Sequence, residues 1–375
     1  MPGVHFEASF RFAIVFAAFL TGCSDGGGTA PLNSGQTLSH GGSLASTTSA
    51  VESVVQTYAA SVPVSNDLLY ISNLGTNTIT VYHHDAQGNT APLDTIGGSN
   101  TGLSAPGQLS EDAAGNLYVA NGSLFKTSSA SGVLVFAHGA NGNVAPIRRI
   151  PVAPGFVGIE AMTVDQSTGK IFIYEADGAR PNPTLFRYPP NATIGTAAFA
   201  QGLDFYPAIQ LASDSTGANL LEAHNAVSPN AAGFGVATIQ KQFSNGTPPN
   251  IVRNTYWFLT AGIADDPTTK TYLAISNGQP GGGIYRLAED TTGSGMPGQP
   301  FSPAPVSIIT SDACGGQLAL GYLRNIYVVH SKASGCPADA VYVYNHDAYG
   351  AAVPIRVLSG TATKLSSPVG IYEGK

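Results

Sequence analysis

The fold can be recognised from three consecutive segments of the chain: Leu117-Tyr-Val-Ala-Asn121, Val133-Leu-Val-Phe136 and Gly142-Asn-Val-Ala-Pro-Ile-Arg148. The first two are short apolar runs of β-branched and aromatic residues, which favour strands. The third begins with Gly-Asn and contains Pro, residues typical of tight turns. Together they predict consecutive antiparallel strands, the third of which starts at a turn.

The same pattern recurs along the chain. Copies of the first run start 48 to 54 residues apart, at Leu69, Leu117, Ile171, Leu220, Tyr272 and Ile326. Copies of the second run are Ile79–Tyr82, Val133–Phe136, Leu185–Tyr188, Gly235–Ile239, Gly283–Leu287 and Ala340–Tyr344. The third run recurs at Gly88–Leu93, Gly142–Ile147 and Gly350–Ile355, with a looser copy at Gly246–Ile251. A fourth run precedes the first at Pro106–Asp112, Ala161–Asp165, Ile209–Asp214, Gly262–Asp266 and Gly316–Leu320.

Four short strands repeated about every 50 residues are typical of propeller blades. The fourth run would be the first, innermost strand of each blade. The first, second and third runs would then be the second, third and outermost strands of that blade. The chain enters its first blade without an inner strand, and the C-terminal segment Ser367–Glu373 would supply it. We therefore predict an all-β protein whose residues 66–375 form a six-bladed propeller of four-stranded antiparallel blades. The C-terminal strand would close the ring and so remove free sheet edges.

The three quoted segments resemble the NHL and Tyr-Val-Thr-Asn class of bacterial β-propellers. The resemblance covers residues 66–375. It implies the fold firmly and the function only loosely, because relatives include lactonases, lyases and pure binding or scaffold proteins.

Composition excludes several classes of protein. The chain has 375 residues with 43% hydrophobic and 10% charged side chains, so intrinsic disorder is not expected. It contains 45 Gly and 25 Pro, which argues against a helical bundle. With 16 basic against 23 acidic residues it lacks the charge to neutralise phosphates, so we expect no nucleic-acid partner.

The N-terminus reads as a bacterial lipoprotein leader. Residues 12–20 form an apolar run of signal-peptide length, too short to span a membrane. The following Leu20-Thr-Gly-Cys23 resembles a lipobox, which implies cleavage before Cys23 and its lipidation. We predict a signal peptide at 1–22 and a lipidated, flexible tether at 23–65. Ser24 after the cysteine implies the outer membrane of a Gram-negative cell envelope; the alternative is an ordinary secretory signal.

Two cysteines remain. Cys314 starts an inner strand, and Cys336 lies in the loop after the second strand of the same blade. Both loops lie on one face of a blade, and export implies an oxidising compartment, so we predict a disulfide. The alternative is a pair of free buried thiols. A site that used only cysteines to hold a metal would need more of them.

The residue ending each second strand forms a column on the face where propeller relatives bind ligands. Its members are Asn73, Asn121, Glu175, His224, Ser276 or Asn277, and His330. Asn73 and Asn121 are candidate ligand-binding residues, although an Asn here can instead bond nearby backbone. Glu175, His224 and His330 offer carboxylate and imidazole groups, which serve both metal sites and acid–base catalysis.

Two further groups are candidates. Gln108, Gln210 and Gln317 occupy equivalent inner-strand positions in alternate blades and would form a polar ring in the channel, holding a ligand or only water. Glu160 could join Glu175 and Asp177 as an acidic patch for Ca²⁺. The resemblance to gluconolactonase-like propellers implies a metal held by Glu, Asp and Asn, but two of those places are His here.

No complete catalytic constellation is visible, so the sequence favours a surface-tethered module that binds a protein, small molecule or glycan, without excluding an enzyme. One alternative is a metal-dependent hydrolase or lyase. In it Ca²⁺ or Zn²⁺ would be held by Glu175, His224 and His330, assisted by Glu160 or Asp177. The other is a structural envelope protein.

Overall fold

A computed structural model of the protein describes residues 67–122, 131–153, 156, 158–176, 184–202, 208–214, 218–224, 235–240, 251–256, 260–276, 282–288, 306–310, 312, 314–321 and 323–374. All of them belong to one compact unit, Val64–Lys375. The predicted signal peptide and tether, with Cys23, lie outside these residues. Over the same ranges, no helix has the length and apolar character needed to cross a membrane.

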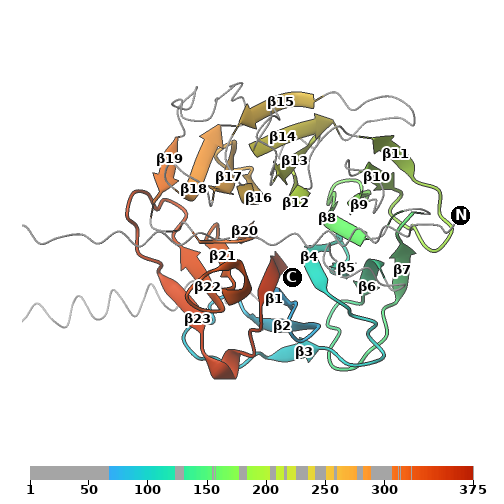
Figure 1. The fold of residues 1–375 in the computed structure, drawn as a ribbon, viewed down its shortest axis with the longest axis horizontal. Coiled ribbons are helices and arrows are strands. Elements are labelled where there is room, and N and C mark those ends of the chain that lie inside the picture. Colours follow the sequence, from blue (N-terminus) through green and yellow to red (C-terminus); the bar gives the residue numbers. More distant parts are fainter. Residues whose placement is uncertain are drawn as a thin grey trace, which may run out of the picture. The chain divides into compact units, whose positions relative to one another are not determined.

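The described strands form six antiparallel four-stranded sheets, numbered here in chain order (Figure 1). Sheet 1 contains β24 (Pro368–Gly374), β1 (Leu68–Asn73), β2 (Thr78–His83) and β3 (Asp94–Ile96). Sheet 2 contains β4 (Pro106–Glu111), β5 (Leu117–Asn121), β6 (Gly132–Phe136) and β7 (Arg148–Pro151). Sheet 3 contains β8 (Gly158–Val164), β9 (Ile171–Ala176), β10 (Thr184–Tyr188) and β11 (Phe199–Gly202).

The other three sheets follow the same order. Sheet 4 contains β12 (Ala208–Ser213), β13 (Asn219–His224), β14 (Gly235–Gln240) and β15 (Ile251–Tyr256). Sheet 5 contains β16 (Thr260–Asp266), β17 (Thr271–Ser276), β18 (Gly283–Ala288) and β19 (Ser307–Ile309). Sheet 6 contains β20 (Leu318–Leu320), β21 (Ile326–His330), β22 (Ala340–Tyr344) and β23 (Arg356–Ser359). Two 3₁₀ turns are described, η1 (Lys332–Ser334) and η2 (Thr361–Thr363).

The first strand of each sheet lies innermost. β4, β8, β12, β16 and β20 lie toward the middle of Figure 1, and each contacts the inner strand of the next sheet. β24 contacts both β20 and β4, and it pairs with β1 from Leu68↔Gly374 to Asn73↔Pro368. The protein is a β-propeller, as predicted from the repeats.

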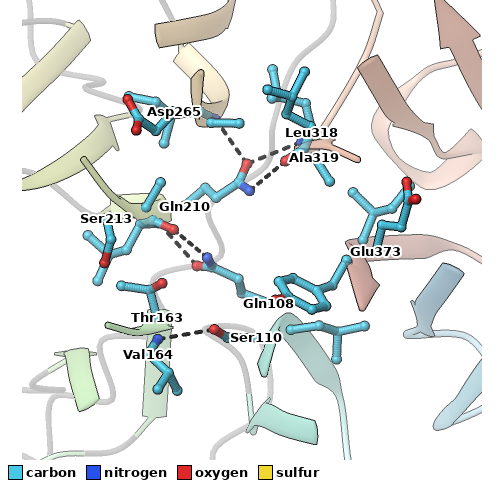
Figure 2. A pocket seen from close by; sticks show the side chains of 18 of the residues that line it. Gln108, Ser110, Thr163, Val164, Gln210, Ser213, Asp265, Leu318, Ala319 and Glu373 are labelled. Carbon is cyan, nitrogen blue, oxygen red and sulfur yellow. Dashed lines mark hydrogen bonds between the residues drawn. The ribbon is translucent and has the colours of Figure 1, made fainter. Parts of the chain in front are cut away.

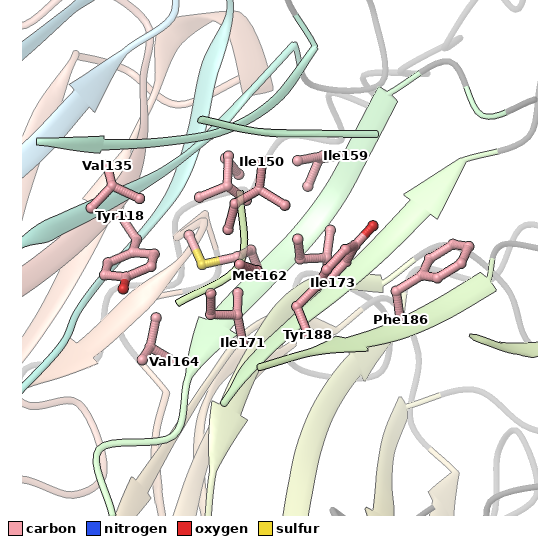
Figure 3. Close-up of a cluster of buried hydrophobic side chains, with 13 residues drawn as sticks. Tyr118, Val135, Ile150, Ile159, Met162, Val164, Ile171, Ile173, Phe186 and Tyr188 are labelled. Atoms are coloured by element: carbon pink, nitrogen blue, oxygen red, sulfur yellow. The ribbon is translucent and has the colours of Figure 1, made fainter. Parts of the chain in front are cut away.

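The core lies between neighbouring sheets, because each sheet carries apolar side chains on both of its faces. One cluster joins sheets 2 and 3 through residues such as Tyr118, Val135, Met162 and Ile173 (Figure 3). Equivalent clusters fill the other junctions, including the one between sheets 6 and 1. Burial on both faces explains why the second strands are continuous apolar runs rather than alternating ones.

The predicted boundaries of the third run are wrong. The segments beginning at Gly88, Gly142 and Gly350 are turns, and the outer strands β3, β7 and β23 start only after each segment's Pro and the apolar residue that follows it. Proline has no N–H to donate to a ladder, so pairing can begin only after it. The first such bond is from Leu93 N–H to Val81 O in sheet 1 and from Ile147 N–H to Val135 O in sheet 2.

These turns link one sheet to the one before it. Gly88 bridges Leu358 of sheet 6, Gly142 bridges Ile96 of sheet 1, and Gly350 bridges Ile309 of sheet 5. The three glycines have φ between +62° and +72°, and a Cβ would meet no atom within 4 Å. Glycine is therefore needed for the backbone conformation and not for space. Each bridge covers part of an outer strand that would otherwise be an open edge.

Candidate functional site

The residues that end the second strands hold the loops that lead into the inner strands. Asn73 Oδ1 accepts a hydrogen bond from Ser366 N–H at 2.9 Å, and Asn121 Oδ1 accepts one from Ser104 N–H at 2.7 Å. Both asparagines are fully buried. Their amide nitrogens are also engaged, that of Asn121 with Gly102 O at 3.2 Å. The two amides, predicted as ligand-binding groups, are thus committed to the protein's own loops.

Glu175 occupies the same position in sheet 3 and has the same kind of partner. Its Oε2 accepts Ala153 N–H at 2.7 Å, and its Oε1 accepts the Tyr188 hydroxyl at 3.3 Å. Burial raises the pKa of this carboxyl to about 7, against the lowering effect of the two hydrogen bonds. Glu175 therefore substitutes for the asparagine of sheets 1 and 2, with an added sensitivity to pH.

His330 is the corresponding residue of sheet 6. Its Nε2 lies 3.0 Å from Asp312 Oδ2, and its ring stacks on Tyr342 with 4.0 Å between centroids. The other oxygen of Asp312 accepts Gly315 N–H at 3.1 Å. The predicted disulfide between Cys314 and Cys336 is confirmed and lies beside this histidine. The loop before β20 is thus held covalently as well as by hydrogen bonds.

The structure describes no shared shell for the proposed metal-dependent enzyme. Asp177 lies outside the described residues, and of His224 only the backbone, at the end of β13, is described. Among described residues, one group of three or more potential metal ligands occurs, formed by Cys314, His330 and Cys336. Glu175 and Glu160 are not part of it.

Glu160 lies instead at the junction of sheets 3 and 4. Burial raises its pKa to about 8, although the carboxyl accepts the Ala208 N–H. The neighbouring Glu222 is fully buried; its pKa is raised by burial first, and repulsion from Glu160 adds to the shift. Burial thus disfavours the charged form of both carboxyls, whereas Ca²⁺ is bound by charged carboxylate oxygens.

Gln108 ties three sheets together across the channel. Its Nε2 donates to Leu211 O at 2.6 Å, and its Oε1 accepts Leu211 N–H at 3.1 Å and Met162 N–H at 3.0 Å. An amide side chain carries one donor group and one acceptor, so it pairs with the inner edge of a strand as another strand would. Figure 2 shows this pairing near the middle of the channel.

Gln210, two sheets further along the chain, has the same arrangement of hydrogen bonds. Its Nε2 donates to Leu318 O at 2.8 Å, and its Oε1 accepts Leu318 N–H at 3.2 Å and Ile263 N–H at 3.0 Å. Gln317 breaks the pattern, because its Nε2 donates to Ile209 O at 2.8 Å while its buried Oε1 has no hydrogen-bond partner among described residues. The glutamine ring that the sequence predicts is therefore a set of unequal cross-links.

A cavity of about 190 Å³ lies on one side of these cross-links. All six inner strands line it, and every lining residue lies at or after the glutamine position of its strand. The cavity therefore lies toward the hairpins that connect inner and second strands. The opposite face, here called the loop face, carries the loops that lead into the inner strands, and it is the face on which propeller relatives bind ligands. The predicted residues Gln108 and Gln210 line it, whereas Asn73 and Asn121 do not.

The cavity wall is polar and acidic. Ser110, Thr163, Ser213, Asp265 and Glu373 contribute oxygen atoms, and Figure 2 shows several of these side chains around the two glutamines. The Ser213 hydroxyl is buried and has no hydrogen-bond partner among described residues. No lysine or arginine is among the described residues of the lining. The wall can thus accept hydrogen bonds and attract positive charge, and it disfavours anions.

The residues after the glutamines were not predicted as a site. Ser110, Ser213 and Asp265 follow the glutamine, or the glycine at its equivalent position, by two or three residues. A polar residue recurring at this offset was the available signal. It resembled ordinary strand alternation, because the sequence does not show which inner-strand positions face a cavity.

Comparisons with known proteins assign no family to this chain. No protein family model matches the chain, and no curated protein matches its sequence. Among solved structures, a chain of the nidogen/laminin complex aligns over 83% of this chain and 99% of its own, with 10% identity and a TM-score of 0.39. A Thermus thermophilus structure titled as a putative oxidoreductase (glucose dehydrogenase) aligns over 73% and 88%, with 14% identity and a TM-score of 0.45. A quinonprotein alcohol dehydrogenase-like protein of Bacteroides thetaiotaomicron aligns over 81% and 77%, with 13% identity and a TM-score of 0.46.

Proposed function

We propose that the protein binds a small neutral or cationic ligand, a polyol or an amine, in the cavity at the centre of the propeller. The observation that carries the proposal is the combination of a polar wall from six strands with two carboxylates and no basic side chain among its described residues. Ser110 Oγ accepts Val164 N–H at 3.1 Å, whereas the Ser213 hydroxyl has no hydrogen-bond partner among described residues.

The size of the cavity restricts the ligand. A volume of about 190 Å³ is below the roughly 300–1,000 Å³ of pockets that hold drug-sized ligands. We therefore expect a ligand no larger than a four- to six-carbon polyol or a short amine. Acids of the same size would meet Asp265 and Glu373 and are expected to be excluded.

The test is a panel of polyols, monosaccharides, amines and small carboxylic acids, measured by thermal shift and then by calorimetry. We expect stabilisation by one of the first three classes and none by the acids. Asp265→Asn should weaken an amine about tenfold or more and a polyol much less, since the variant removes charge but keeps an acceptor. Asp85→Asn, an exposed site outside the cavity, is the matched control. Binding of acids, or binding that Asp265→Asn and Ser213→Ala both leave unchanged, would contradict the proposal.

We also propose that the propeller is presented from the cell envelope on a lipid anchor. Support comes from the apolar run at 12–20 and the Leu20-Thr-Gly-Cys23 segment. Cys23→Ser should move the protein from the membrane fraction to the soluble fraction. Ser24→Asp should keep the anchor but shift the protein from the outer to the inner membrane. Membrane recovery of the Cys23→Ser variant would contradict the anchor.

We further propose that the six sheets form a closed ring of six blades. In support, β24 pairs with β1, contacts the inner strands on both sides, and shares an apolar cluster with sheet 6. Removing residues 367–375 should then destabilise the whole propeller rather than fray one end, which limited proteolysis of the truncated chain would detect.

A further inference from the structure

The loop face carries a second group of polar side chains, separate from the cavity. A ring nitrogen of His330 and the sulfurs of Cys314 and Cys336 all lie within 4.8 Å of one another. Cys336 and His330 are buried, and Cys314 is partly exposed. Their order in the chain places Cys314 before β20, His330 at the end of β21, and Cys336 in the loop that follows.

One ring nitrogen of the histidine is held by a carboxylate. Asp312, which is buried, is hydrogen-bonded to Nε2 of His330 and is itself fixed by the Gly315 N–H. Tyr342 stacks on the ring and restricts its rotation. A carboxylate that accepts a hydrogen bond from one ring nitrogen keeps the proton there and leaves the lone pair on the other nitrogen. Zinc-binding histidines are usually held by a neighbouring residue in this way. Nδ1 is the nitrogen that Asp312 does not hold.

The two sulfurs are joined in the disulfide, so they can bind a metal only after reduction. In a tetrahedral zinc site, sulfurs about 2.3 Å from the ion are roughly 3.8 Å apart. The two sulfurs are bonded to each other in the oxidised protein, so both cysteine side chains would have to rotate apart to reach that separation. The Cα atoms, 5.7 Å apart, need not move for this change.

We propose that this group is a redox-controlled zinc site, closed as a disulfide and opened by reduction to a Cys₂His site. A dithiol reductant would supply two electrons and two protons, becoming a disulfide itself as the Cys314–Cys336 bond breaks into two thiols. Zn²⁺ would then bind both sulfurs and Nδ1 of His330, with release of the two thiol protons. Two thiolates and an imidazole suit Zn²⁺ better than Ca²⁺, which prefers oxygen ligands. A fourth position would be open to water or another ligand.

The test uses the full chain without a histidine tag. The oxidised protein and the protein reduced by a dithiol, then separated from it without oxygen, are titrated with Co²⁺ and with Zn²⁺. We expect one ion per reduced chain, with the thiolate charge-transfer and intense visible bands of tetrahedral Co²⁺, and no binding by the oxidised chain. Elemental analysis after dialysis gives the zinc stoichiometry.

Variants assign the ligands. His330→Ala should abolish tight binding, and Asp312→Asn should weaken it about 10- to 100-fold through loss of the positioning contact. His138→Ala, an exposed turn histidine, is the matched control and should bind normally. Binding unchanged by His330→Ala, or no binding by a reduced chain that keeps its far-UV circular dichroism, overturns the proposal.

Reduction itself could unfold sheet 6. The reduction is therefore repeated with Zn²⁺ present and with a chelator present. Native circular dichroism that persists with Zn²⁺ and is lost with the chelator supports the site. Unfolding in both conditions overturns it.

Discussion

The two ends of the inner strands use polar side chains in opposite ways. At the loop end, Asn73, Asn121, Glu175 and His330 each bond the loop that leads into the inner strand of their own sheet. At the hairpin end, Ser213 and its neighbours line a cavity, and the Ser213 hydroxyl has no hydrogen-bond partner among described residues. Repetition in a propeller thus marks structural roles as readily as functional ones.

Between the two ends, the glutamines show what the middle of the channel requires. An inner strand has an unpaired edge facing the channel, and its N–H and C=O groups need partners. Gln108 and Gln210 provide them across to sheets 3, 4, 5 and 6. Gly262 leaves the space for this, because a Cβ there would lie 2.7 Å from Gly316 O and 3.0 Å from Gln210 Oε1.

The largest expected effect is that of Gln210→Leu. The change removes three hydrogen bonds to the backbone of sheets 5 and 6 and leaves those groups buried. At about 1 to 3 kcal/mol per unsatisfied group, we expect a loss of roughly 4 kcal/mol in urea unfolding. Gln317→Leu, which removes the single bond to Ile209 O, should cost about 1 kcal/mol. If the two variants lost the same free energy of unfolding, the idea that Gln210 and Gln317 contribute unequally would be wrong.

Removing the disulfide should have the next largest effect. The double variant Cys314→Ser, Cys336→Ser frees a loop with a sequence separation of 22 residues. On the chain-entropy account this costs about 3 kcal/mol under oxidising conditions. The reduced, metal-free natural chain should match the variant. A difference between those two would mean that the serines add an effect of their own.

We expect the free energy of unfolding to depend on pH because of Glu175. Its folded pKa of about 7 lies above the ordinary value of 4.5, so the folded state holds the proton more tightly than the unfolded state. Stability should therefore fall as pH rises from about 4.5 to 7, by on the order of 3 kcal/mol for this group. Glu175→Gln, which stays neutral, should flatten that part of the pH profile and be the more stable form at pH 8. The Glu160 contribution should remain, because its pKa is about 8. If the stability of Glu175→Gln fell with pH as steeply as that of the natural protein, Glu175 would not be the group responsible.

The smallest effect is expected at Ser213. Ser213→Ala removes a buried hydroxyl with no partner among described residues, so unfolding should change by less than about 0.5 kcal/mol. Ser72 is the matched contrast in sheet 1. Its hydroxyl donates to Gly107 O at 2.7 Å and accepts Gly370 N–H at 2.8 Å. Ser72→Ala should cost about 1 to 2 kcal/mol, measured the same way. Similar costs at the two serines would remove the distinction between the structural and cavity positions.

Much of the architecture could be predicted from local pattern. The second strands matched their predicted runs within a residue or two, because they are buried on both faces and rich in β-branched residues. The outer strands begin later than predicted, because the turn that starts at Gly142, a glycine with a positive φ, continues through the proline, which has no N–H for pairing. The disulfide could be predicted because both cysteines lie in loops of one blade.

The repeat, the strand order and the candidate residues follow from the sequence alone, because each depends on spacing along one chain. The roles of the inner-strand side chains depend instead on the fold in three dimensions. Gln108 and Ser213 are both polar inner-strand residues that line the cavity, yet Gln108 bonds Leu211 in another sheet and the Ser213 hydroxyl has no hydrogen-bond partner among described residues. That distinction depends on where residues about 100 positions away are placed, and the pattern of residues within one repeat carries no information about it.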